Sequence, residues 1–258
     1  MKLFVRRFGQ GNPVIILHGL LGMSDNWVTF GRRLGADFGV FIPDLRDHGQ
    51  SPHHAVFNYS ALSDDLCEMV MEYGLSDIIL IGHSLGGKTS MEFALHHPDL
   101  LKKMIIVDIA PRSYPSDLGH LGLIRAMMEV DLTTLHSRSQ VESQLEKKVP
   151  DPRLCQFLLK NIYWKDKDTL AWRPDLPVLL KNLPLLGKGI TSNLRFEKPV
   201  LWIRGGRSKY VLDSDVPEIL KQFPRASVET IANASHWVHA DAPEEFYDRV
   251  HDFLITRQ

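Results

Sequence analysis

Ser84 is the residue in this sequence best placed to act as a nucleophile. It lies at the centre of Gly82-His83-Ser84-Leu85-Gly86, directly after the apolar run Ile78 to Ile81 and directly before a helical pattern. Such a sharp turn holds the serine in a strained backbone conformation, and side chains at 82 and 86 would collide with neighbouring backbone. The turn also places the hydroxyl near the amino end of a helix, whose dipole favours negative charge. The segment predicts a nucleophile elbow, with a tight turn and an incidental serine as the alternative.

A second turn offers the donors that such a reaction needs. His18-Gly19-Leu20-Leu21-Gly22 directly follows the apolar run Val14 to Leu17. A tetrahedral intermediate requires two N–H groups aimed at its oxyanion, and the backbone N–H groups of Leu20 and Leu85 are the natural pair. His18 precedes the turn, so we expect it to hold the loop rather than to act as a base.

The base for Ser84 is expected after the last strand, in Asn233-Ala234-Ser235-His236-Trp237-Val238-His239. We favour His236 as the residue that takes the serine proton. His239, three residues later, is the competitor, because an imidazole there could instead line the pocket or hydrogen-bond the loop.

The elements that would position these residues follow an alternating pattern. Short β-branched runs alternate with longer helical patterns, which is typical of an α/β fold with a mostly parallel sheet and helices on its faces. The expected strands are Leu3 to Phe8, Val14 to Leu17, Val40 to Pro43, Ile78 to Ile81, Met104 to Val107, Val200 to Arg204 and Val228 to Ile231. The expected helices are Asn26 to Leu34, Ser60 to Tyr73, Ser84 to His97, Val216 to Gln222 and Pro243 to Ile255, with Ser60 and Asp215 as N-caps.

One long interval, from Pro111 to Lys198, contains no expected strand. It offers helical pieces instead, at Gly122 to Leu135, Ser139 to Lys147, Arg153 to Tyr163 and Leu176 to Leu186. We therefore expect a helical cap over 111–198, inserted into a core formed by residues 1–110 and 199–258. Its apolar residues could line an acyl pocket or pack the cap onto the core: Leu118, Leu121, Leu123, Ile124, Met127, Met128, Phe157, Leu158, Trp164 and Trp172.

Taken together, these motifs resemble the α/β-hydrolase superfamily, in the branch of small lidded esterases of the YbfF type and the mitochondrial abhydrolase-domain esterases. The resemblance covers nearly the whole chain. It includes the turn from Pro43 to Ser51, similar to the D-x-R-x-H-G-x-S pattern of the superfamily, where Arg46 and His48 are expected to brace loops. It implies hydrolysis through an acyl-enzyme and a lid that selects the substrate. We expect the helical cap to be inserted after the sixth strand.

The triad acid departs from the commonest pattern of this superfamily. Many relatives carry it in a turn after the seventh strand, but here that turn has Ser208 at the expected carboxylate position. Asp108 closes the strand Met104 to Val107, which in the usual strand order lies beside the strand that carries Ser84. We expect Asp108 to be the acid, with Asp213 or Asp215 as alternatives that more plausibly cap a helix. His83 and Lys88, beside the elbow, are either pocket or packing residues.

Composition limits the kind of partner. Lys and Arg total 30 against 31 for Asp and Glu, so no strong field attracts nucleic acid or an acidic membrane surface. Cys67 and Cys155 lie far apart in apolar helical patterns, which favours packing roles in a reducing compartment. Without an apolar run long enough for a signal peptide or a membrane span, a cytoplasmic location is expected. No metal-binding or phosphate-loop motif occurs, so we expect no metal and no cofactor.

The expected activity is that of a carboxylesterase-type serine hydrolase acting on a small acyl ester or acyl thioester. Ser84, Asp108 and His236 would form the catalytic triad, and Leu20 and Leu85 the oxyanion hole. The fold leaves other activities open: a carbon–carbon bond hydrolase, a lyase, a cofactor-free peroxidase, or a receptor-like hydrolase shell that only binds a ligand. Epoxide hydrolases and dehalogenases are disfavoured because they need a carboxylate nucleophile in place of Ser84.

Overall fold

The main sheet has seven strands in the order β1-β3-β2-β4-β5-β8-β9. The computed structural model describes residues 1–115 and 119–256. The strands are β1 (Val5–Phe8), β2 (Pro13–Leu17), β3 (Gly39–Pro43), β4 (Ile78–His83), β5 (Leu101–Val107), β8 (Val200–Gly205) and β9 (Ala226–Ile231). Only β1, at an edge, pairs antiparallel, and the other strand pairs are parallel. The mostly parallel α/β architecture predicted from the sequence is confirmed.

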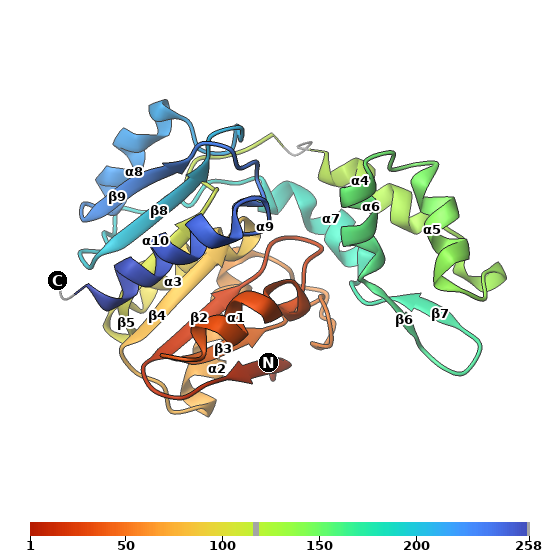
Figure 1. Ribbon diagram of the computed structural model, residues 1–258, viewed down its shortest axis with the longest axis horizontal. Helices are drawn as coiled ribbons and strands as arrows, with labels where there is room; N and C mark the ends of the chain where they lie inside the picture. Colours follow the sequence, from red (N-terminus) through yellow and green to blue (C-terminus); the bar gives the residue numbers. More distant parts are fainter. Residues whose placement is uncertain (116–118, 257–258) are drawn as a thin grey trace.

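Helices cover both faces of this sheet (Figure 1). One face carries α1 (Val28–Leu34) and α10 (Pro243–Ile255), and the other carries α2 (Tyr59–Glu72), α3 (Leu85–His96) and α8 (Val216–Gln222). Successive strand residues point to opposite faces. In β2, Val14 and Ile16 therefore join the core under α10, while Ile15 and Leu17 join the core under α2 and α3. Burial on both faces explains why the central strands are continuous apolar runs.

Several element ends differ from the sequence-based expectation. Helix α2 begins at Tyr59, and its N-cap is Asn58, whose side chain accepts a hydrogen bond from the Ala61 N–H at 2.9 Å, so the assignment of Ser60 as the cap is wrong. Asp215 does precede α8, but its carboxylate accepts from the Leu212 N–H at 2.8 Å instead of capping the helix. The remaining short elements are α9 (Val238–Asp241) and the 3-10 turns Ser24–Trp27, Pro98–Leu100, Leu132–Thr134 and Asp213–Asp215.

In the described part of the long segment between β5 and β8, no strand joins the main sheet. It contains α4 (His120–Met128), α5 (Arg138–Glu146), α6 (Pro152–Leu159) and α7 (Leu176–Leu186), and α4, α5 and α6 lie together to one side of the sheet (Figure 1). Counted along this chain, the segment follows the fifth strand, not the sixth.

The expectation that this segment contains no strand is wrong. An antiparallel hairpin is formed by β6 (Ile162–Trp164) and β7 (Leu170–Trp172), with Ile162 opposite Trp172. Three residues per strand are too few for a two-residue periodicity to stand out in the sequence. The Trp172 indole N–H donates to the Met127 carbonyl at 3.0 Å and so ties the hairpin to α4.

Neither cysteine forms a disulfide. Cys67 is half-buried in α2 and Cys155 is buried in α6. Burial raises the pKa of both thiols, so both remain protonated near neutral pH and act as small apolar side chains. No helix within residues 1–115 and 119–256 combines the length and apolar character that a membrane crossing requires.

Candidate active site

Ser84 occupies the turn between β4 and α3 in a strained backbone conformation. Its φ of 53° and ψ of −114° lie in a region that residues with a side chain seldom adopt. The neighbouring glycines permit the turn, since a Cβ at Gly86 would lie 2.5 Å from the Leu17 carbonyl oxygen and one at Gly82 would lie 2.4 Å from the Gly86 oxygen. The steric reason given for these glycines from the sequence therefore holds. Strain at one residue, sustained by its surroundings, is typical of a reactive position.

The loop after β2 lies directly against this turn. The Gly86 N–H donates to the His18 carbonyl at 3.1 Å, and a Cβ at Gly19 would lie 3.3 Å from the Ser84 Cβ. The Gly19 carbonyl accepts from the Gly22 N–H at 3.0 Å and from His18 Nδ1 at 2.8 Å. Because the carbonyl and N–H of a trans peptide point in opposite directions, these bonds fix the direction of the Leu20 N–H.

Two buried histidines, His18 and His48, hold the loop after β2 as neutral imidazoles. His18 donates through Nδ1 to the Gly19 carbonyl, so its Nε2 accepts the Leu45 N–H at 3.0 Å. His48 donates through Nδ1 to the Arg46 carbonyl at 2.9 Å, and its Nε2 accepts the Leu21 N–H at 3.1 Å. Each ring must therefore present one N–H and one lone pair. His18 has the loop-holding role expected from its place before the turn.

Asp108 follows β5 as a fully buried carboxylate with three donors. Its Oδ1 accepts from the Gly205 N–H at 3.0 Å, and its Oδ2 accepts from His236 Nδ1 at 2.8 Å and from the Ser208 hydroxyl. A buried carboxylate is tolerated only when its lone pairs are satisfied in this way. Because the Asp108 carboxylate accepts a hydrogen bond from Nδ1, Nδ1 carries the proton of the neutral His236 ring. The lone pair then lies on Nε2, the atom that a general base would use.

His236 is held on two further sides. The Tyr210 ring stacks on its imidazole, with centroids 3.7 Å apart and planes at 17°. His83 donates from Nε2 to the His236 carbonyl at 2.9 Å, which ties the loop after β9 to the elbow. Burial raises the pKa of Tyr210 to about 12, so its ring stays uncharged and can stabilise an imidazolium through its π face.

The competing residues lie in other contacts. His239 stacks on Trp27, with centroids 4.0 Å apart, and has no carboxylate partner among the described residues. Asp213 pairs with Arg204 at 2.6 Å and Asp215 with Arg112 at 2.9 Å. The structure thus places Ser84, Asp108 and His236 after the carboxyl ends of β4, β5 and β9, with Asp108 and His236 hydrogen-bonded to each other, and leaves the alternatives outside this arrangement.

Ser208 and Tyr210 are site residues that sequence reasoning missed. Ser208 donates to Asp108 and accepts the Tyr210 N–H at 3.1 Å. The sequence contains one signal, a serine where a carboxylate is expected, but the lack of a charge at this position does not report that its hydroxyl can donate a hydrogen bond. The Tyr210 stack depends on two loops 26 residues apart and has no local signature.

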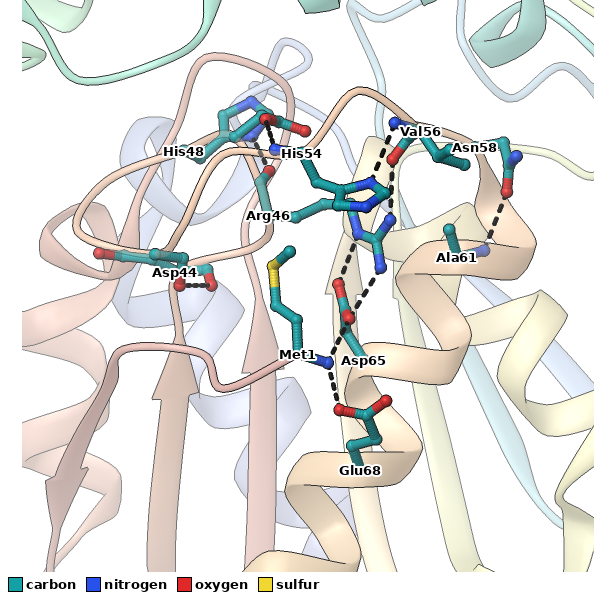
Figure 2. A network of polar contacts seen from close by, with 12 residues as sticks. Met1, Asp44, Arg46, His48, His54, Val56, Asn58, Ala61, Asp65 and Glu68 are labelled. Atoms are coloured by element: carbon teal, nitrogen blue, oxygen red, sulfur yellow. Dashed lines mark hydrogen bonds and ion pairs between the residues drawn. The ribbon is translucent and has the colours of Figure 1, made fainter.

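The turn after β3 is braced by an ion-pair network (Figure 2). Arg46 makes two parallel hydrogen bonds to Asp65, at 2.6 and 2.8 Å, and a third to the Val56 carbonyl at 2.8 Å. The Met1 amine also pairs with Asp65, at 2.9 Å, and with Glu68. This network fixes the segment from which His48 reaches Leu21, in line with the bracing role expected for Arg46 and His48.

A cavity of about 620 Å³ lies beside Ser84 and His236. Its walls come from the loop at Leu20, from Trp27, from Trp237 and from the inserted segment. Of the apolar residues suggested as pocket lining, Leu123 and Phe157 do line this cavity. Ile124, Met127 and Leu158 are buried in the packing of the inserted segment, Met128 and Trp164 are exposed, and Leu118 lies outside the described residues.

Known proteins resemble this chain in sequence and in overall structure. The sequence pattern of the alpha/beta hydrolase fold family matches residues 12–147. The chain belongs to this family. The sn-1-specific diacylglycerol lipase ABHD11 of Xenopus laevis is 36% identical over 250 residues, covering 95% of this chain and 80% of that protein. Esterase YbfF of Escherichia coli is 32% identical over 259 residues, covering 98% and 99%. A solved marine microorganism esterase has a TM-score of 0.95 at 37% identity and covers 98% and 99%.

In this α/β-hydrolase, the candidate triad acid follows β5, and the turn after β8 supplies a hydroxyl donor to that acid. The predicted membership of the superfamily and of its esterase branch is confirmed by the relatives.

The neutral histidines predict a loss of stability in mild acid. Burial lowers the pKa of His18 to about 4, and burial together with the nearby His18 lowers that of His48 to about 3. Between about pH 6.5 and these values the unfolded chain binds more protons, so the free energy of unfolding falls as the pH falls, by up to about 1.4 kcal/mol per pH unit for each histidine. Urea unfolding at pH 7.5, 6 and 5 measures this trend. A His48→Gln variant should show a shallower slope, and a wild-type free energy that rises towards pH 5 contradicts the account.

Proposed function

We propose that this protein is a carboxylesterase-type serine hydrolase that cleaves carboxylic acyl esters through an acyl-enzyme on Ser84. The observation that carries the proposal is the 2.8 Å hydrogen bond between His236 Nδ1 and Asp108 Oδ2, formed beside a strained serine elbow. An imidazole held in this tautomer by a carboxylate has the arrangement of a serine hydrolase base. The names of relatives with 32 to 37% identity, a diacylglycerol lipase and two esterases, support ester substrates.

In the acylation step, Ser84 Oγ attacks the ester carbonyl carbon while its proton passes to His236 Nε2. The carbonyl electron pair moves onto oxygen, which accepts hydrogen bonds from the N–H groups of Leu20 and Leu85. Leu85 is the first residue of α3, so its N–H has no acceptor within the helix and is available for this role. The intermediate then expels the alkoxide, which takes the proton from His236 and leaves as the alcohol.

Water resolves the acyl-enzyme by the same route. His236 Nε2 takes a proton as the water oxygen attacks the acyl carbon, and the second intermediate collapses to a carboxylic acid as Ser84 regains its proton. Asp108 keeps its charge throughout and stabilises the imidazolium in both steps. An acyl thioester would react identically, with a thiol as the leaving group. No step requires a metal or an organic cofactor.

We assign the segment 111–198 as a cap that selects the substrate, with residues 1–110 and 199–258 as the catalytic core. Residues from α4 and α6 line the cavity beside Ser84, which supports this role. The unpaired thiols of Cys67 and Cys155 support a reducing compartment and hence a cytoplasmic location.

The test is hydrolysis of p-nitrophenyl butyrate and of butyryl-CoA by the purified protein, with butyric acid measured in both reactions. Release of the acid from the ester supports the esterase assignment, and the ratio of the two rates separates ester from thioester preference. Binding of both compounds without any release of acid would instead support the receptor-like alternative and contradict the proposal.

Ser208 gives a more local prediction about the triad. Changing Ser208 to alanine removes a hydrogen bond to the charged Asp108 and leaves the Tyr210 N–H without its acceptor. Hydrogen bonds to charged groups are worth about 1.5–3 kcal/mol, so kcat/KM for an ester should fall by about 10- to 100-fold. Steady-state kinetics measure this loss, and Ser208→Thr, which keeps a hydroxyl, should recover part of it. Equal activity of Ser208→Ala and wild type would show that the hydroxyl does not position Asp108.

A further inference from the structure

A second, smaller chamber shares Leu20, Ser84 and His120 with the lining of the large cavity. It has a volume of about 50 Å³, and Leu85 also lines it. A water-sized group needs roughly 10–15 Å³ of such space, so the chamber holds only a few heavy atoms. The acyl chain and the alcohol of a bound ester extend in different directions from the carbonyl at Leu20 and Leu85, so one part would occupy the chamber and the other the large cavity.

The chamber contains a buried lysine that the proposed mechanism does not use. Lys88 lies one helical turn after Ser84 on α3, and only 1% of its surface is exposed. Side chains on a helix lean towards its amino end, so the lysine stem runs towards the elbow. The Lys88 ammonium lies 4.9 Å from the centre of the Tyr114 ring and 5.6 Å from that of Tyr59, and both tyrosines line the chamber.

The ammonium of Lys88 is only partly satisfied by the protein. It has three donors, and among the described residues it makes one hydrogen bond, to the Lys188 carbonyl, and no ion pair. Lys88 makes no hydrogen bond to either tyrosine hydroxyl among the described residues: Tyr59 donates to the Leu186 carbonyl, while Tyr114 donates to the Tyr210 carbonyl and accepts the Ala110 N–H. Burial and the nearby Arg112 lower the pKa of Lys88 to about 7, as expected for a cation without a counter-charge.

A second buried lysine in the chain shows what a purely structural role looks like. Lys103 on β5 is also buried, but its ammonium donates to three carbonyls, those of Phe253, Leu254 and Thr256. These acceptors lie at the carboxyl end of α10, where a cation is favourable. All three N–H donors of Lys103 therefore have acceptors. Among the described residues, Lys88 has an acceptor for only one of its three N–H donors, and it lines the same chamber as Ser84.

We propose that the small chamber binds the acyl part of the substrate and that Lys88 selects short acyl groups that end in a carboxylate. The substrate class is a half-ester of a dicarboxylic acid with three or four carbons, whose free carboxylate supplies the counter-charge and the acceptors that Lys88 lacks. This inference rests on the proposed esterase function and names its substrate class. It makes Lys88 a specificity-determining residue.

The experiment compares two esters of one alcohol, 4-methylumbelliferyl butyrate and 4-methylumbelliferyl hemisuccinate, whose acyl chains differ by the terminal carboxylate. For the wild type we expect kcat/KM to favour the hemisuccinate by about 10-fold or more, as a charge-assisted hydrogen bond would give. In Lys88→Met the ratio of hemisuccinate to butyrate kcat/KM should fall by about 10- to 100-fold. Lys103→Met, which removes the other buried ammonium, should leave the ratio unchanged.

The outcomes separate this inference from the esterase function on which it rests. Hydrolysis of the butyrate with no preference for the hemisuccinate in the wild type overturns the role of Lys88 and leaves the esterase function standing, even if Lys88→Met fails to fold. An unchanged ratio in a folded Lys88→Met protein also overturns it and assigns Lys88 to packing. Failure of the wild type to hydrolyse either ester counts against the esterase function itself.

Discussion

Replacement of Ser84 by alanine is expected to lower kcat for an ester substrate by about 10⁶-fold, because the members of such a triad act as a unit. Without the hydroxyl no acyl-enzyme forms, and His236 has no proton to take. The residual rate would come from substrate binding and the N–H groups of Leu20 and Leu85. Initial rates with p-nitrophenyl butyrate at high enzyme concentration measure the loss.

The matched control for this change is Ser63→Ala. Ser63 is also a buried serine, but it lies on α2 and forms no hydrogen bond with Ser84, Asp108 or His236. It should retain the wild-type rate. A Ser84→Ala protein that is folded and hydrolyses the ester as fast as Ser63→Ala would remove Ser84 from the mechanism.

Replacement of Asp108 by asparagine is the second large effect, an expected loss of about 10⁴-fold in kcat, the size seen when the equivalent change is made in a serine protease triad. The amide would still fill the buried site after β5, but it cannot stabilise an imidazolium, and its NH₂ group favours the wrong His236 tautomer. The loss should appear in kcat more than in KM, since Asp108 faces His236 and not the cavity.

Asp213→Asn and Asp215→Asn serve as controls for this assignment. Their carboxylates pair with Arg204 and Arg112, whose side chains are partly exposed, and neither carboxylate contacts His236, so each variant should keep kcat within about threefold of the wild type. If Asp215→Asn lost more activity than Asp108→Asn, the acid would have to be reassigned to the turn after β8.

The parts of this fold that could be predicted from the sequence are those whose signals are local. Continuous apolar runs predicted the central strands. Helical periodicity predicted α7, α8 and α10 with the bounds that the structure shows. The cap of α2 was misplaced because Asn58 and Ser60 are both good N-cap residues two positions apart. The β6–β7 hairpin could not be predicted because its strands have three residues each, and the hydrogen bond from Trp172 to the Met127 carbonyl that ties it to α4 has no local signature.

The residues of the candidate site also fall into those with a local sequence signal and those without one. Ser84, Leu20, Leu85 and His236 lie in turns with recognisable spacing, so they could be nominated from the sequence. The choice of Asp108 over Asp215 needed the strand order, which places β5 between β4 and β8. The roles of Ser208 and Tyr210 depend on where two distant loops meet, and no periodicity or motif reports such a contact.

The central claim is that Ser84 is a nucleophile activated by His236, and the most direct measurement is covalent labelling with a fluorophosphonate. The intact protein is treated with the probe, its mass is measured, and the modified peptide is mapped. The account predicts a single adduct on the peptide that contains Ser84, strongly slowed in Asp108→Asn and absent in Ser84→Ala. An unlabelled wild-type protein, or an adduct that persists in Ser84→Ala, would contradict it.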